Sequence, residues 1–165
     1  MTGDTSRNPA RPGDQGHLLD DLVLGLDHVG IAVADLSAAV TWYREVLGAH
    51  CTHEEVNGEQ QVAEAMLTLG PSGPVIQLLC AMSPESPIGR FVQRRGPGLQ
   101  QIAVRVRDID EALRRLHAAG VHMVDEYPRV GTAGSRIAFI HPRASGGVLV
   151  ELVEPAPEEP GRVSG

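Results

Sequence analysis

The stretch LDHVGIAVADLSAAVTWYREVLGA (residues 26–49) has a second version in the same chain, LQQIAVRVRDIDEALRRLHAAGVH (residues 99–122). Each version begins with an apolar run typical of a buried strand and continues into apolar residues at helical spacing. An aspartate, Asp35 or Asp108, stands just ahead of each helical segment, where it can cap the helix N-terminus. The two stretches therefore predict the same strand–helix unit twice.

Three more strand-like runs follow each predicted helix, so each half of the chain reads β-α-β-β-β. They are predicted at 49–56, 61–69 and 75–81 in the first half and at 121–126, 135–141 and 147–154 in the second. Two such modules can pair their sheets and enclose a cleft between them. The predicted fold class is α+β, with two tandem βαβββ modules whose curved sheets enclose a cleft.

The domain limits follow from composition. Of the 165 residues 42% are apolar but only 3% are aromatic, which allows one aliphatic core. We predict a single domain at 23–156, with modules at 25–82 and 98–155. Both ends, 1–22 and 157–165, are rich in Gly, Pro and charged residues. We expect them to be a disordered extension and a disordered tail, because they can bury little apolar surface.

Charge and cysteine content narrow the class of function. The net charge of −7 argues against a general nucleic-acid or membrane-surface binder. No segment approaches the length of a membrane-spanning helix, and the N-terminus lacks the apolar core of a secretory signal. Cys51 and Cys80 form no CxxC motif and fit a reduced protein. These features predict a cytoplasmic location.

The repeat also places polar residues at equivalent positions of apolar strands. His28 aligns with Gln101, and Gln77 in VIQLLCA aligns with Glu151 in LVELVEP. Each of these residues alone is explained well enough as a structural or solvated side chain. Together they would project an imidazole, two amides and a carboxylate into one cleft. Such a set suits a divalent metal of hard to intermediate character, and the lack of thiolates disfavours structural zinc.

Several motifs resemble one known family. The stretches LDHVGIAVADL, EQQVAEAML, SPIGRF, GTAGSRIAFIHP and GVLVELVE look like those of methylmalonyl-CoA epimerases, within the vicinal oxygen chelate superfamily. The similarity runs over residues 26–154, and the SPIGRF and GTAGSRIAFIHP stretches are its more specific parts. The resemblance implies the vicinal oxygen chelate fold, an acyl-CoA thioester substrate and a homodimer.

The resemblance also implies a ligand set for a divalent metal ion: His28, Gln77, Gln101 and Glu151. Co²⁺ is the first choice, with Mn²⁺, Ni²⁺, Zn²⁺ or Mg²⁺ as alternatives. The chain departs from the family at Gln101, where the family usually has a histidine. An amide oxygen is a competent ligand but a weaker donor than imidazole for late transition metals, so we expect weakened or re-tuned metal binding.

The same resemblance assigns acid–base roles to Glu64 and Glu151. Inversion of the carbon between a thioester and a carboxylate needs such a group on each face of the planar intermediate. Glu64 stands among apolar residues in QVAEAML, so burial could raise its pKa toward neutrality. The implied activity interconverts (2R)- and (2S)-methylmalonyl-CoA, an isomerase reaction.

Other functions stay open at this point. One is an epimerase for another 2-alkylmalonyl-CoA, such as ethylmalonyl-CoA, and another is a non-catalytic small-molecule-binding protein of the same fold. A ring-cleaving dioxygenase is disfavoured by Gln101, and a glyoxalase by Gln77. We interpret His53, Glu54 and Glu55 as a solvated strand edge. We interpret Arg90, Arg94 and Arg95 as a solvated helix face, and His141 as a structural or substrate-lining residue.

Overall fold

The protein is built from two copies of the predicted unit joined by a helix. The structure, a computed structural model, describes residues 17–71 and 73–157. The first unit comprises β1 (Val23–Val33), α1 (Leu36–Leu47), β2 (His50–Asn57), β3 (Val62–Thr68) and β4 (Val75–Ala81). The linker contains α2 (Pro87–Arg95). The second unit comprises β5 (Gly98–Val106), α3 (Ile109–Ala118), β6 (Arg129–Val130), the 3₁₀ turn η1 (Thr132–Gly134), β7 (Arg136–Ile140), the 3₁₀ turn η2 (Pro142–Ala144) and β8 (Leu149–Glu154).

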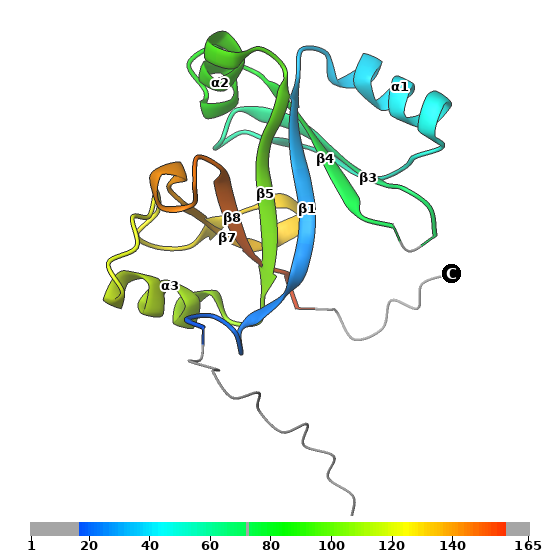
Figure 1. Cartoon of the computed structure of the whole chain (residues 1–165). Coiled ribbons are helices and arrows are strands. Elements are labelled where there is room, and N and C mark those ends of the chain that lie inside the picture. The colour runs from blue at the N-terminus through cyan, green and yellow to red at the C-terminus, as the bar shows by residue number, and fades with distance from the viewer. Residues whose placement is uncertain (1–16, 72, 158–165) are drawn as a thin grey trace, which may run out of the picture.

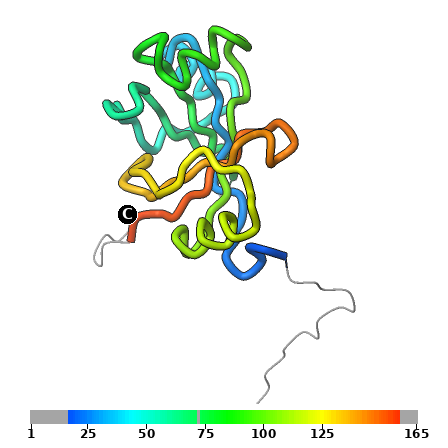
Figure 2. Tube along the Cα trace, turned by 90° about the vertical axis from the view of Figure 1, so that its left-hand side faces the viewer, coloured from blue at the N-terminus to red at the C-terminus, as the bar shows by residue number. Residues whose placement is uncertain are grey.

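The strands of both units form one sheet, in the order β2-β3-β4-β1-β5-β8-β7-β6. The long strands β1 and β5 run antiparallel at its centre (Figure 1). In their register Gly30 lies opposite Gln101. Each of these two strands also pairs in parallel with the last strand of its own unit. Figure 2 shows most of the first unit above most of the second. The predicted α+β fold of two tandem modules is confirmed, with the two module sheets merged into one.

The helices α1 and α3 cover the outer face of the sheet. Val40 of α1 packs against the cluster around Leu67 and Leu78, and Leu113 of α3 packs in the cluster that contains Leu152. Because side chains alternate along a strand, the neighbours of these strand residues point to the opposite, inner face. The linker helix α2 packs on that inner face, where Ile88 contacts the cluster of Ala32, Val62 and Leu79. The inner face is where the predicted site residues lie.

The predicted caps hold the helices that follow β1 and β5. Asp35 accepts a hydrogen bond from the backbone N–H of Ala38 at 2.9 Å, and Asp108 accepts one from Glu111 at 2.9 Å. Such a cap contributes about 1 kcal/mol to stability. Gly48 ends α1 in the left-handed region with φ of 67°, a conformation that glycine adopts without strain. None of the helices in the described ranges is long and apolar enough to cross a membrane.

The strand predicted at 121–126 does not form, and this prediction was wrong. Within it only Met123 makes a β-bridge, to Ile140 of β7. The backbone N–H of Phe139 is bound instead by the side chain of Asp125, at 2.9 Å. A carboxylate thus takes the place of a ladder carbonyl, and regular pairing resumes only at the two-residue strand β6.

The first described residues pack against the second unit. Residues 17–22 fall inside the predicted N-terminal extension, yet Leu22 is only 5% exposed and belongs to the core around α3. Asp21 forms an ion pair with Arg115 of α3 at 2.5 Å. The rest of the predicted extension and the predicted tail from residue 158 onward lie outside the described residues. The predicted domain limits therefore stay predictions. The predicted cytoplasmic location also stays a prediction.

Candidate active site

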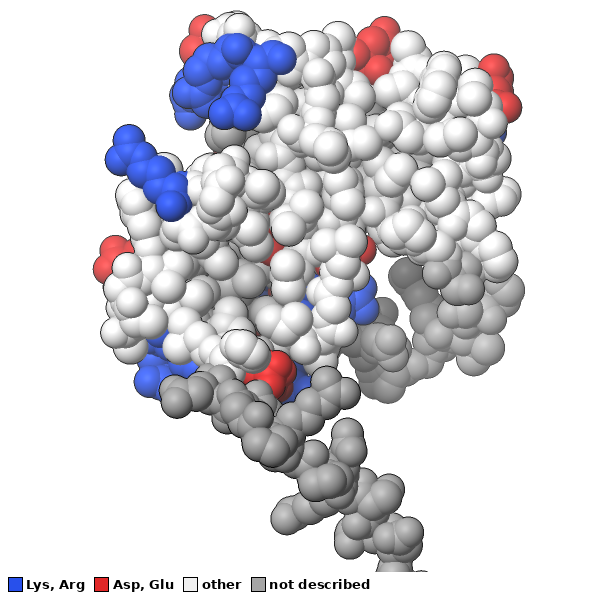
Figure 3. Space-filling model, in the orientation of Figure 1, with Lys and Arg blue, Asp and Glu red and all other residues white. Residues whose placement is uncertain are grey.

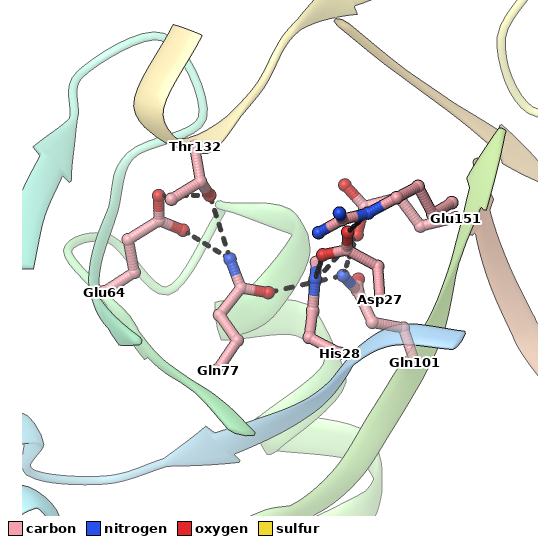
Figure 4. A network of polar contacts seen from close by, with 8 residues as sticks. Asp27, His28, Glu64, Gln77, Gln101, Thr132 and Glu151 are labelled. Atoms are coloured by element: carbon pink, nitrogen blue, oxygen red, sulfur yellow. Dashed lines mark hydrogen bonds and ion pairs between the residues drawn. The ribbon is translucent and has the colours of Figure 1, made fainter. Parts of the chain in front are cut away.

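The five predicted site residues lie together on the inner face of the sheet. They come from β1, β3, β4, β5 and β8, and each is between 3% and 6% exposed: His28, Glu64, Gln77, Gln101 and Glu151. Four of them line a cavity of about 320 Å³, a volume in the range of small-ligand sites. Figure 4 shows Glu64 on one side of this group and Glu151 on the other, with Gln77 between them.

His28 has one ring nitrogen in use and one available. Its Nδ1 lies 2.8 Å from Asp27 Oδ1, and Arg105 on β5 holds the other Asp27 oxygen at 2.7 Å. Its Nε2 lies 3.4 Å from Glu151 Oε2, which is within ion-pair distance, but the two groups are not aligned for a hydrogen bond. A carboxylate on Nδ1 fixes the tautomer that leaves the Nε2 lone pair free to bind a metal.

The Gln77 amide is held by Glu64 and Thr132, on the side of the site away from His28. Its Nε2 donates to Glu64 Oε2 and to Thr132 Oγ1, each at 3.0 Å. These two bonds use both N–H donors of the amide. The amide oxygen consequently points toward Gln101, whose Nε2 lies 3.5 Å away. Gln77 thus presents an acceptor oxygen to the centre of the site.

Gln101 closes the ring of polar contacts by donating from Nε2 to Glu151. A half turn of the amide about its last side-chain bond would exchange its nitrogen and oxygen at little cost. Gly30 lies directly under this side chain, since a Cβ at position 30 would come 2.6 Å from Gln101 Cγ. The glycine therefore gives Gln101 the space in which it lies.

The donor set fits a divalent metal ion. It offers one imidazole nitrogen, two amide oxygens and one carboxylate, and the buried Nε2 of His28 has no hydrogen-bond partner in the described residues. Buried polar atoms are nearly always satisfied, so such an atom calls for a ligand. Within the described ranges no three His, Cys, Asp or Glu side chains gather as a metal cluster. Two of the four proposed ligands are glutamine amides, so only two belong to these four residue types.

The charges around His28 favour its protonated form when no metal is bound. Burial lowers its pKa, but the neighbouring carboxylates of Asp27 and Glu151 outweigh burial and raise the pKa to about 9. The hydrogen bond to His28 is the main cause that lowers the pKa of Asp27. A metal ion would compete with that proton for Nε2, so metal binding at this site would release a proton.

Glu64 is a carboxyl group with a raised pKa. Burial is the main cause, and the nearby carboxylates of Glu55 and Glu151 add to it, while the hydroxyl of Thr132 acts in the opposite direction. Together they raise the pKa of Glu64 to about 7. Thr132 Oγ1 donates to Glu64 Oε1 at 2.7 Å. A carboxyl group that titrates near neutral pH is suited to accept and return a proton.

Thr132 is a functional candidate that the sequence reasoning missed. It lies in the glycine-rich GTAGS stretch, which the resemblance marked as specific without assigning a role. A Cβ at Gly131 would lie 2.6 Å from Ile137 Cγ2, and Ala133 adopts φ of 52° and ψ of 34°. This tight turn places the threonine hydroxyl over Glu64 and Gln77. Asp27 was missed as well, although its position next to His28 could have indicated it.

The group His53, Glu54 and Glu55 only partly matches the interpretation as a solvated edge. Glu54 is exposed, but Glu55 pairs across the sheet with Glu64 and lies 2.5 Å from His53 Nε2. Glu55 also accepts a hydrogen bond from the backbone N–H of Ala133 at 3.3 Å. Glu55 therefore supports the turn that carries Thr132.

Comparison with known proteins places this site in a family. Residues 27–139 match the model of the Glyoxalase/Bleomycin resistance protein/Dioxygenase superfamily, so the chain belongs to that superfamily. Within it, the chain belongs to the family of methylmalonyl-CoA epimerases, as three relatives show.

A crystal structure of methylmalonyl-CoA epimerase from Mycobacterium tuberculosis superposes with a TM-score of 0.79 at 54% identity, over 82% of this chain and 91% of that one. A methylmalonyl-CoA epimerase in complex with methylmalonyl-CoA and NH4⁺ has a TM-score of 0.76 at 39% identity, over 81% and 96% of the two chains. The ethylmalonyl-CoA/methylmalonyl-CoA epimerase of Cereibacter sphaeroides is 36% identical over 77% of this chain and 95% of its own length. The predicted family is confirmed.

Proposed function

We propose that this protein is an isomerase that interconverts (2R)- and (2S)-methylmalonyl-CoA. The observation that carries the proposal is a pair of buried carboxyl groups, one from each module, at the two sides of one cavity. Glu64 comes from β3 and Glu151 from β8, and the amides of Gln77 and Gln101 connect them. Inversion at C2 needs a proton acceptor on one face and a proton donor on the other.

The chain's own residues divide the work as follows. Glu64, with its pKa of about 7, removes the C2 proton of one epimer or returns it to the planar intermediate. Glu151 acts from the opposite face. Thr132 holds the Glu64 carboxyl group, and Gln77 binds its second oxygen. These contacts leave the carboxyl group little freedom to turn away from the substrate, which is how positioning raises the rate.

We propose a divalent metal ion as the cofactor, held by His28, Gln77, Gln101 and Glu151. When bound, the ion supplies a positive charge that stabilises the negative charge of the enolate oxygen. Co²⁺ is the first metal to test, followed by Mn²⁺, Ni²⁺, Zn²⁺ and Mg²⁺. Removal of the metal with a chelator should abolish activity, and one of these ions should restore it.

A second candidate substrate is ethylmalonyl-CoA. The Cereibacter sphaeroides relative bears both substrates in its name. The cavity wall near the two carboxyl groups includes the apolar side chains of Leu79, Ile137 and Phe139, against which a longer alkyl group can pack. Parallel assays with methylmalonyl-CoA and ethylmalonyl-CoA measure the preference. A protein that binds these thioesters without turning them over would support the non-catalytic function instead.

We also propose that the protein is a homodimer. The large apolar side chains of Trp42 and Val46 lie one turn apart on α1 and are more than half exposed. A partner subunit would remove this surface from water, which is favourable. Light scattering after size exclusion measures the mass in solution, and the mass of a monomer would contradict the proposal.

The decisive experiment follows loss of the C2 proton of methylmalonyl-CoA in D2O by NMR, with Co²⁺ added. Spontaneous exchange gives the baseline. Each epimer is assayed separately, and Glu64→Gln should slow the exchange of the epimer whose C2 proton faces Glu64 at least about a hundredfold, because it removes that proton acceptor and keeps the shape. Glu54→Gln, an exposed carboxyl group on β2, is the matched control and should behave like the unaltered protein. Exchange at the baseline rate in a folded, metal-loaded protein would rule out this substrate.

A further inference from the structure

The arginines of this chain fall into two groups. All 14 basic residues are arginine, and the described residues contain eleven of them. Six of the eleven form ion pairs with carboxylates: Arg44, Arg105, Arg114, Arg115, Arg129 and Arg136. The other five have no ion pair among the described residues, and four of them lie on two neighbouring elements: Arg90, Arg94 and Arg95 on α2, and Arg143 on η2.

Three of these four arginines line a second cavity outside the candidate active site. This outer cavity measures about 530 Å³, and its walls include α2 and the segment from His141 to Leu149. No Asp or Glu is among its described lining residues, although the chain carries a net charge of −7. Figure 3 shows a blue patch over α2 and further blue atoms below it, with no red surface between the two.

The outer cavity adjoins the cavity that contains the two carboxyl groups. The two share Arg90, Gln100 and Leu149 among their lining residues. The buried Oε1 of Gln100 has no hydrogen-bond partner in the described part of the chain. An unsatisfied amide oxygen on the wall shared by two cavities suits a ligand that carries N–H donors past it. A cluster of arginines, an amide acceptor and the proposed acid–base pair therefore line two adjacent cavities.

The helix that carries the arginines is held rigidly. Ser86 caps α2 by accepting from the N–H of Gly89 at 3.0 Å, and Ile88 is buried against the sheet. Gly89 packs so closely that a Cβ there would lie 2.3 Å from the carbonyl oxygen of Ser83. Cations at a helix C-terminus are favourable by themselves, which explains Arg94 and Arg95. That explanation does not cover Arg90 in the first half of α2, nor the arginine on η2.

We propose that Arg90, Arg94, Arg95 and Arg143, here called the arginine rim, bind the phosphate groups of the CoA carrier. The proposal rests on the proposed function, which places the acyl end of a CoA thioester beside Glu64. CoA carries a pyrophosphate and a ribose phosphate at the far end of an arm that contains two amide N–H groups. Guanidinium groups bind phosphates with paired, charge-assisted hydrogen bonds. A positive rim on an acidic protein also steers a polyanionic substrate to the cavity.

The test compares an Arg94→Gln/Arg95→Gln double variant with Arg107→Gln in the full-length protein. Arg107 is a matched control, since it is exposed, has no ion pair among the described residues and lines neither cavity. Binding of free CoA is measured by calorimetry at several salt concentrations. Deuterium exchange is measured with methylmalonyl-CoA and with the methylmalonyl thioester of N-acetylcysteamine, which lacks the phosphates.

The arginine rim predicts a specific pattern. The double variant should bind CoA about tenfold more weakly or worse, with a smaller dependence on salt. Its preference for the CoA thioester over the N-acetylcysteamine thioester should fall by a similar factor, through KM rather than kcat. Arg107→Gln should match the unaltered protein. Equal loss of CoA affinity in the control and the double variant, or no loss in either, would overturn the proposal.

The same experiment separates the two proposals. If the unaltered protein binds CoA through the arginine rim but exchanges neither substrate, the rim stands and the epimerase function falls. If it exchanges both substrates and the double variant retains full preference for the CoA thioester, the function stands and the rim falls. If it neither binds CoA nor exchanges either substrate, both fall.

Discussion

Replacing Glu64 by glutamine should change how the stability of the protein depends on pH. Burial is the main cause that raises the pKa of Glu64 from 4.5 to about 7 in the folded state. One pKa unit corresponds to about 1.4 kcal/mol. Ionising this buried carboxyl group therefore destabilises the folded protein by about 3 kcal/mol relative to its protonated form.

The sign of the effect follows from which state binds the proton more tightly. Because the folded pKa lies above the unfolded one, protonation of Glu64 stabilises the folded state. This contribution is fully present below pH 4.5 and is lost as the pH rises through about 7. Glutamine does not titrate. The unfolding free energy of the unaltered protein minus that of Glu64→Gln should accordingly fall by about 3 kcal/mol over this range.

The measurement is urea unfolding of both proteins from about pH 5 to about pH 8, with a chelator present to remove metal. His28 titrates over part of the same range, but it is present in both proteins and its effect cancels to first order. Glu54→Gln is again the control. Its carboxyl group is exposed, so its substitution removes no buried charge and should not change how stability depends on pH. Stability curves of the unaltered protein and Glu64→Gln that stay parallel over the whole range would refute the reasoning.

Three substitutions test the proposed metal site by titration with Co²⁺. Gly30→Ala places a Cβ 2.6 Å from Gln101 Cγ and should lower the affinity about tenfold, and unchanged affinity would argue against Gln101 as a ligand. Asp27→Ala removes the carboxylate on His28 Nδ1 and should weaken binding about 10- to 100-fold; a variant that binds Co²⁺ normally would show that the tautomer is fixed in another way. Gln101→His supplies an imidazole and should strengthen binding, so weaker binding would contradict the expected order of donors.

The internal repeat is what made much of this molecule predictable. Once residues 26–49 and 99–122 were matched, strand alternation put His28 and Gln101 on the same face, and the last strands added Gln77 and Glu151. The structure places all four in one buried group, together with Glu64. A polar residue at equivalent places in two apolar strands predicts a shared site without any knowledge of long-range packing.

Other features depended on contacts that no repeat encodes. Thr132 reaches Glu64 from a turn whose geometry depends on Gly131 and on a strained Ala133. The missing strand at 121–126 reflects one side chain, Asp125, that takes a backbone hydrogen bond from β7. Both features depend on a single local side chain or turn. Apolar periodicity carries no information about them.

The antiparallel seam between β1 and β5 also has a meaning for symmetry. It relates His28 to Gln101 and Gln77 to Glu151, so these pairs surround a local twofold axis. The strand register also identifies the counterpart of Glu64. Glu64 lies opposite Leu79, two positions after Gln77, and Ile137 lies opposite Val153, two positions after Glu151. The counterpart of Glu64 is therefore an isoleucine, Ile137. Two identical modules would carry a glutamate at both the Glu64 position and its counterpart, or at neither. Joining the modules in one chain permits a single lone carboxyl group beside an otherwise paired set of ligands.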